Sequence, residues 1–204
     1  MLRLTEVVKH LLIINILVFF AMQIYPALYD YLPMASPWSD AFMPMQIVTH
    51  MFAHANFTHL FLNMFGLYMF GPILENQMGP KRFLAYYLIT GLGAAVIYVL
   101  SFILQFYFRF GDQWTMALPH IPTVLGASGA IFGLLVAFGM IFPNMRVMLL
   151  FPPIPMKAKY MVLLFALIEI VSGVGNLQPG VANFAHLGGA ITGAILILFW
   201  RRRV

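Results

Sequence analysis

A serine and a histidine stand among small residues in two separate parts of the chain. Ser128 is the third residue of the sequence Gly-Ala-Ser-Gly, and His186 is the second residue of Ala-His-Leu-Gly-Gly. A serine hydroxyl becomes nucleophilic at neutral pH when a histidine accepts its proton, and the ordinary imidazole pKa of about 6.5 suits that exchange. We therefore predict a Ser–His dyad, although a serine among small residues is also a common packing position in a membrane helix.

Glycines on the same two segments indicate how the serine and the histidine could meet. Gly129 and Gly133 are four residues apart, and so are Gly189 and Gly193. A glycine at every fourth position of a helix lets a partner backbone approach closely. We expect the two helices to pack against each other at these glycines and to bring the serine hydroxyl within reach of the histidine ring.

The chain in front of the serine predicts a helix start at the site. Pro119 and Pro122 precede it, so the helix is expected to begin near Ser128, with Gly126 just before that start. The first backbone N–H groups of a helix have no partner within it, and they lie at the positive end of the helix dipole. Such amides suit an oxyanion that develops during acyl transfer.

Two further polar side chains stand in an apolar stretch. His59 and Asn63 are four residues apart, which places them on one face of a helix. Polar groups are costly inside a bilayer, so they are functional candidates, although a hydrogen bond between helices is an equally plausible role for this pair alone. His54 is expected at the entrance of this helix, in a structural role.

The sequence offers no evident third member for the dyad and no metal site. Glu169, in an apolar stretch, is the one rival, and it is interpreted as a protonated or hydrogen-bonded contact between helices. His50, His54 and His59 lack the His-Glu-x-x-His spacing of a zinc site, and the chain has no cysteine. We therefore expect no metal and no cofactor.

The composition places these residues in a membrane. The 204 residues are 62% hydrophobic and only 8% charged, with a mean hydropathy of +0.91. A soluble domain carries about a quarter charged residues, so an ordinary soluble protein is excluded, and a disordered chain needs the opposite balance. The net charge of +5 is not clustered on a polar segment, so we expect no nucleic-acid partner. The expected fold is an all-α membrane bundle forming a single domain over residues 1–204.

Six apolar stretches are candidates for crossing the bilayer. The first resembles a signal peptide, but it is longer than a typical apolar signal region and lacks a good cleavage site, so we interpret it as a retained helix. The expected crossings lie near residues 7–25, 56–74, 83–104, 128–142, 160–174 and 183–200.

The positive charges predict the orientation. Ten of the eleven Lys and Arg residues fall on one side of a six-crossing bundle, and Arg109 alone falls on the other. Cytoplasmic loops are enriched in Lys and Arg, so both termini are expected in the cytoplasm. The polar residues described above then lie toward the outer ends of their helices, at a similar depth.

Four segments together resemble the rhomboid family of intramembrane serine proteases. Each motif is weak alone, but their order, spacing and placement on the expected helices are specific. The similarity extends over nearly the whole chain and matches the minimal six-helix bacterial form of the family. The matching segments are 126–129, 185–189, 54–66 and 75–83.

The resemblance implies a role for each candidate residue. Ser128 would attack a peptide bond of a transmembrane substrate, and His186 would act as base and then as acid. The backbone N–H of Ser128 and the side chains of His59 and Asn63 would form the oxyanion hole. Phe132, one turn beyond the serine, would stack on the histidine ring, where some relatives have tyrosine.

The resemblance also implies a setting for the reaction. Substrate helices would enter sideways from the lipid of the cell membrane, of the bacterial inner-membrane type, with the stretch 160–174 as the gate and the loop Gly175–Val181 closing an outward-facing cavity. The family often has a Trp-Arg pair in its first loop, whereas Ser39 follows Trp38 here, which leaves the bracing of the loop at 26–53 open.

Two other classes of protein remain as alternatives. A catalytically silent membrane chaperone or binding protein with the same fold would typically lack the serine or the histidine, and this chain has both. A small transporter or channel would be expected to show inverted repeats with paired broken helices, and we find no convincing internal repeat.

Overall fold

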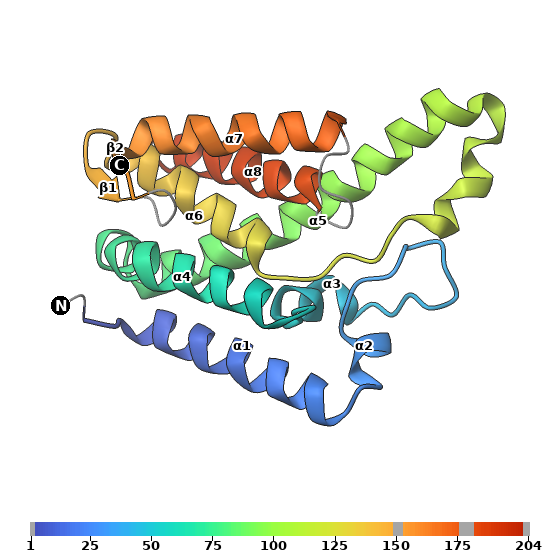
Figure 1. Cartoon of the computed structure of the whole chain (residues 1–204), viewed down its shortest axis with the longest axis horizontal. Coiled ribbons are helices and arrows are strands. Elements are labelled where there is room, and N and C mark those ends of the chain that lie inside the picture. The colour runs from blue at the N-terminus through green and yellow to red at the C-terminus, as the bar shows by residue number, and fades with distance from the viewer. Residues whose placement is uncertain (1–2, 149–152, 176–181, 202–204) are drawn as a thin grey trace.

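The computed structural model describes residues 3–148, 153–175 and 182–201 of the chain (Figure 1). Helices dominate these ranges, and two short strands join the bundle. The elements are α1 (Glu6–Ile24), α2 (Leu28–Tyr31), α3 (Gln46–Thr49), a 3₁₀ helix (His50–Phe52), α4 (Phe57–Met78), α5 (Pro80–Phe110), a second 3₁₀ helix (Gly111–His120), α6 (Ser128–Ile141), β1 (Arg146–Met148), β2 (Pro155–Lys157), α7 (Ala158–Gly175) and α8 (Asn183–Arg201).

Five helices within the described ranges are long and apolar enough to cross a bilayer. They are α1, α4, α5, α7 and α8, while α6 is an apolar helix of only 14 residues. The chain is therefore a multi-pass membrane protein. The helices begin and end close to the predicted stretches, except that α5 extends past the predicted residue 104 to Phe110. Backbone conformation explains its bounds, because Gly79 and Gly111, which flank it, have φ of 80° and 52°.

The described residues are mostly helical, as predicted, with one short exception. Between α6 and α7, strand β1 pairs with β2 in an antiparallel hairpin, with Val147 opposite Met156. Each strand has three residues, which is too short for an alternating pattern to show in the sequence. Val147 is buried, so the hairpin covers one end of the helical core.

The short helix α6 occupies the centre of the bundle. It packs against α4, α5, α7 and α8, and most of its residues are buried. Helix α1 lies outside this group against α4, as Figure 1 shows. A helix that is apolar on all sides is expected in such an enclosed position. The site at the start of α6 is therefore held by several surrounding helices.

A buried carboxylate attaches α1 to α4. Glu75, near the end of α4, is 5% exposed and accepts hydrogen bonds from the hydroxyl of Thr5 and from the backbone N–H groups of Val7 and Val8, the two amide contacts being 3.1 and 3.0 Å long. These are amides of the first turn of α1, which have no partner within the helix. The negative charge also lies at the positive end of the helix dipole.

The loop at 26–53 is braced by a glutamine and not by an aromatic–arginine pair. The side chain of Gln46 is fully buried, and its Oε1 accepts from the backbone N–H groups of Ala35 and Met43 at 3.2 and 3.1 Å. Its Nε2 donates to the carbonyl oxygen of Ala41 at 3.2 Å. One amide thus holds several turns of this loop together, while Trp38 is 46% exposed.

We predict that Glu75→Gln destabilises the bundle without altering the site at α6. An amide keeps the size of the side chain but loses the charge-assisted hydrogen bonds, so the free energy of unfolding should fall by about 1–3 kcal/mol. Thermal unfolding in detergent micelles measures the change. The matched control is Glu6→Ala, which removes an exposed carboxylate from the start of α1, the helix end that Glu75 binds. This change should leave the midpoint almost unchanged. Equal midpoints for Glu75→Gln and the wild-type chain would contradict the assignment.

Candidate active site

The start of α6 is shaped by a glycine that admits the ring of His59. Gly126 has φ of 117°, in the region that favours glycine, and its N–H donates to the carbonyl oxygen of His50 at 2.8 Å. A Cβ at this position would lie 2.7 Å from Nε2 of His59. No side chain caps the helix at Ala127, so the first amides of α6, beginning with that of Ser128, are left without a side-chain cap. The expected helix start at the serine is confirmed.

The predicted glycine packing between α6 and α8 is present. A Cβ on Gly189 would lie 1.9 Å from the carbonyl oxygen of Gly129, and one on Gly193 would lie 3.0 Å from Cα of Gly133. Gly129 also faces α5, where its Cβ would meet that of Ala94 at 2.4 Å. Side chains larger than hydrogen do not fit in this contact, so the two backbones touch along one turn.

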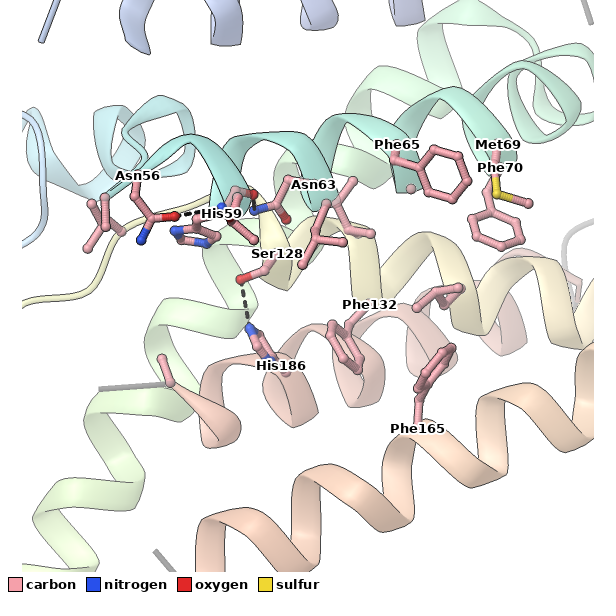
Figure 2. A pocket seen from close by; sticks show the side chains of 18 of the residues that line it. Asn56, His59, Asn63, Phe65, Met69, Phe70, Ser128, Phe132, Phe165 and His186 are labelled. Atoms are coloured by element: carbon pink, nitrogen blue, oxygen red, sulfur yellow. Dashed lines mark hydrogen bonds between the residues drawn. The ribbon is translucent and has the colours of Figure 1, made fainter. Parts of the chain in front are cut away.

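This packing brings the serine and the histidine together. Nε2 of His186 lies 2.8 Å from Oγ of Ser128, at hydrogen-bond distance (Figure 2). The ring of Phe132 stacks on the imidazole, with centroids 4.5 Å apart and planes inclined by 7°. The face of the imidazole is thus covered by an aromatic ring, which limits its rotation and leaves Nε2 directed at the hydroxyl.

The candidate residues of α4 lie on the other side of the serine. The backbone N–H of His59 donates to Oδ1 of Asn56, the cap of α4, at 2.9 Å, and Nδ2 of Asn63 donates to the carbonyl oxygen of His59 at 2.9 Å. That contact uses one hydrogen of the Asn63 amide and leaves the second for another acceptor. Figure 2 shows both side chains beside Ser128.

His54 supports the ring of His59. The two rings meet edge to face with centroids 5.1 Å apart, and His54 is fully buried. Burial lowers the pKa of His54 to about 4, and the neighbouring His59 adds to the effect. His54 is therefore neutral at pH 7 and lies just before the first turn of α4, as the sequence suggested.

A groove of about 780 Å³ opens in front of these residues. Ser128, His186, His59 and Asn63 all line it, so the structure gathers the four predicted site residues around one space. Figure 2 shows the groove between α4 on one side and α7, which carries Phe165, on the other. Most of its lining is apolar, and its polar lining includes these four residues.

A carboxylate lies beside the histidine, and it belongs to Glu169, the one rival for a third member of the dyad in the sequence. Oε1 of Glu169, on α7, lies 3.0 Å from Nδ1 of His186, and Oε2 accepts a hydrogen bond from Nδ2 of Asn183 at 2.7 Å. Nδ1 has no hydrogen-bond partner among the described residues, because the carboxylate lies off the direction of its N–H bond. The interpretation of Glu169 as a hydrogen-bonded contact between helices agrees with its bond to Asn183, but its position beside the imidazole was not predicted. The only signal was one acidic residue in an apolar stretch.

Two further predictions concern a metal site and a closing loop. In the described ranges, no group of three or more His, Asp or Glu side chains could hold a metal ion. The predicted closing loop, Gly175–Val181, lies outside the described residues apart from its first glycine.

Comparison with known proteins identifies relatives for most of the chain. A family model described as the Rhomboid domain matches residues 41–203. The chain is 34% identical over 154 residues to Rhomboid protease AarA of Providencia stuartii, covering 72% of this chain and 52% of that relative. It is 28% identical over 151 residues to the Putative rhomboid protease YdcA of Bacillus subtilis, covering 74% and 64%.

A relative from a eukaryote shows a similar overlap. The chain is 27% identical over 154 residues to Rhomboid protein 1, mitochondrial, of Saccharomyces cerevisiae, covering 74% of this chain and 40% of the relative. The matched region thus spans about half the length of the first relatives.

We predict that Gly189→Ala forces α6 and α8 apart. The added methyl group would overlap the backbone carbonyl of Gly129, which cannot turn aside as a side chain would. Overpacking of this kind costs about 1–3 kcal/mol, so the thermal midpoint in detergent should fall. Ile195→Val on the same helix, at a position that is 61% exposed, is the control and should leave the midpoint unchanged. A wild-type midpoint for Gly189→Ala would show that the two backbones do not touch.

Proposed function

The chain belongs to the rhomboid family, and from this premise we propose that it is an intramembrane serine endopeptidase that cleaves transmembrane-helix substrates. The observation that supports this most strongly is the 2.8 Å contact between Oγ of Ser128 and Nε2 of His186 at the wall of the apolar groove. A hydroxyl paired with a neutral imidazole is an activated nucleophile. The groove supplies the apolar surroundings that a peptide segment drawn from lipid requires.

The reaction follows from the geometry of the pair. Oγ of Ser128 attacks the carbonyl carbon of the scissile peptide bond while its proton passes to Nε2 of His186. The imidazolium then gives this proton to the leaving amine, the C–N bond breaks, and an acyl-enzyme remains on the serine. Water attacks the acyl-enzyme with His186 again as base, which releases the carboxylate product and restores the hydroxyl.

We assign the oxyanion hole to three donors around the start of α6. The backbone N–H of Ser128 lies at the positive end of the α6 dipole, which favours negative charge. The second amide hydrogen of Asn63 is not needed for its contact with the carbonyl of His59, and the ring of His59 lines the same groove. Donors held in place before the reaction stabilise the tetrahedral intermediate without reorganising.

The length of α6 supports a site below the membrane surface. Its 14 residues extend about 21 Å, whereas the hydrocarbon core is about 30 Å thick. If the end of α6 reaches one surface, Ser128 at its start lies about 10 Å below the other. The residues 121–127 lead the chain down to it, and water would reach the serine from that side.

We place both termini and the hairpin in the cytoplasm, in a six-crossing topology with residues 1–204 as a single domain. The start of α1, the end of α8 and the hairpin β1–β2 lie at one end of the bundle (Figure 1). The cations Lys81, Arg146 and Lys157 are at the start of α5 and in the hairpin, whereas Arg109 ends α5. This distribution follows the positive-inside rule for a bacterial inner membrane, with the serine toward the outer side.

Substrates would enter the groove between α4 and α7. In Figure 2 the groove is bounded by these two helices, and many residues of α7 are exposed and apolar, including Leu163, Leu167 and Val174. The exposed residues of α7 from Leu163 to Val174 are all apolar, so this face of the helix can shift against lipid without exposing a polar group. We therefore assign α7 as the gate, with transmembrane proteins and membrane lipid as partners and without a nucleic acid or a cofactor.

We predict that Ser128→Ala and His186→Ala each lower kcat by at least about 10⁴-fold, because the nucleophile or its base is lost. Cleavage of a synthetic transmembrane peptide in liposomes, followed by mass spectrometry, measures the rate. Ser101→Ala is the control, since that hydroxyl on α5 donates to its own helix at Tyr98. Wild-type rates in both folded variants would refute the protease assignment. An intact chain that binds the peptide without cutting it would favour the silent chaperone or binding protein.

We predict a smaller loss for Asn63→Ala. Removing one oxyanion donor lowers kcat by about 10²- to 10³-fold, while KM should change little because the donor acts mainly in the transition state. Asn76→Ala is the matched control, since that asparagine is exposed near the end of the same helix. A fall in substrate affinity with unchanged kcat would remove Asn63 from the oxyanion hole and make it a binding residue.

A further inference from the structure

Glu169 is a buried carboxylate that the reaction as described does not use. It lies in the middle of α7 and is 8% exposed, in a helix whose other residues are almost all apolar. A charged side chain inside a bilayer is costly unless it is paired. Its position therefore calls for a partner, and the structure provides two on α8.

The two carboxylate oxygens have different neighbours. Oε2 accepts from Nδ2 of Asn183 at 2.7 Å, and Oε1 lies 3.0 Å from Nδ1 of His186. Asn183 is 5% exposed and precedes the histidine by three residues, so both face α7 from the first turn of α8. The asparagine holds one oxygen and thereby directs the other toward the imidazole.

No other described carboxylate accompanies the histidine. Glu75 binds the start of α1 and Glu6 pairs with Lys9, while the three aspartates lie outside the long helices α4 to α8. Glu169 is therefore the acidic group that can compensate a charge on this ring.

The remaining helices around His186 present no acidic group. From α4 the titratable neighbour is His59, which interacts electrostatically with His186. From α6 the neighbours are Ser128 and Phe132. On α5 the hydroxyl groups of Tyr86 and Tyr98 donate to backbone carbonyls elsewhere in the fold.

We propose that Glu169 is a positioning residue that completes a Ser128–His186–Glu169 arrangement; this inference rests on the function proposed above. Its carboxylate keeps the proton of the neutral imidazole on Nδ1, so that the unprotonated Nε2 faces the serine. When the serine proton passes to Nε2, the positive charge forms beside the carboxylate. Glu169 stays ionised throughout and takes no proton, and the proton on Nε2 goes on to the leaving amine.

The apolar surroundings make this contact matter more than it would in water. An imidazolium without a counter-charge is strongly disfavoured in a medium of low dielectric constant. The carboxylate lies off the N–H direction, so in the resting structure it acts through charge and not through a formed hydrogen bond. The charged ring that forms during the reaction attracts the carboxylate more strongly, so the contact is stronger in the transition state than in the ground state.

The test is a pH–rate profile of Glu169→Gln in the full-length chain, with a synthetic transmembrane peptide in liposomes between pH 5 and 9. The amide preserves the shape but not the charge, so we expect kcat on the plateau to fall by about 10- to 100-fold with KM nearly unchanged. Removing the counter-charge should also displace the acid side of the profile, which the loss of a merely structural contact would not do. Glu169→Asp keeps the charge, so it should return kcat and the acid side of the profile most of the way to their wild-type values.

Glu75→Gln is the matched control for the loss of a buried carboxylate. It should lower the thermal midpoint but leave the acid side of the profile in place. If Glu169→Gln behaves in the same way, with wild-type kcat and profile, Glu169 is only a structural contact and the inference is overturned. If Ser128→Ala or His186→Ala still cleaves, the proposed function fails instead, so the two failures are distinguishable.

Asn183→Ala provides a second route if Glu169→Gln does not fold. It keeps the carboxylate but removes the hydrogen bond that directs it, so kcat should fall by about 3- to 10-fold with KM unchanged. A wild-type kcat in folded Asn183→Ala would contradict the positioning role.

Discussion

The site depends on a contact between two backbones. Where Gly129 of α6 meets Gly189 of α8, there is no room for a side chain, and this contact sets the depth and the rotation of one helix against the other. One residue before the first glycine stands Ser128, and three before the second stands His186. Because the helices are rigid, their relative position at the glycines also fixes the positions of both side chains. The 2.8 Å distance between Oγ of Ser128 and Nε2 of His186 therefore follows from glycine packing and not from a local loop.

The lipid surroundings explain why a few buried polar side chains each hold more than one part of the fold. Inside the bundle a polar group without a partner is costly, and three buried side chains each make several polar contacts. Glu75 fastens α1, Gln46 braces the first loop, and Glu169 reaches both Asn183 and His186. The same arrangement that satisfies the buried carboxylate also places a negative charge at the histidine.

Much of this arrangement could be predicted from the sequence, because it depends on the hydropathy and the residue spacing along the chain. Hydropathy locates the helices, and glycines four residues apart indicate the contact that joins Ser128 to His186. The contact of Glu169 with His186 could not be predicted, since α7 is apolar nearly all round and its periodicity does not fix which face meets α8. The brace at Gln46 and the strand around Val147 also depend on contacts between segments that no local pattern records.

We infer that the packing of α6 against α8 makes Ser128 the activated hydroxyl among the described serines. The most direct measurement is mass-spectrometric mapping of the residue modified by a fluorophosphonate probe in the folded wild-type protein. We expect one adduct, on Ser128, that is lost in His186→Ala because the base is absent. An adduct on any other serine, or none in a preparation that cleaves its substrate, would contradict it.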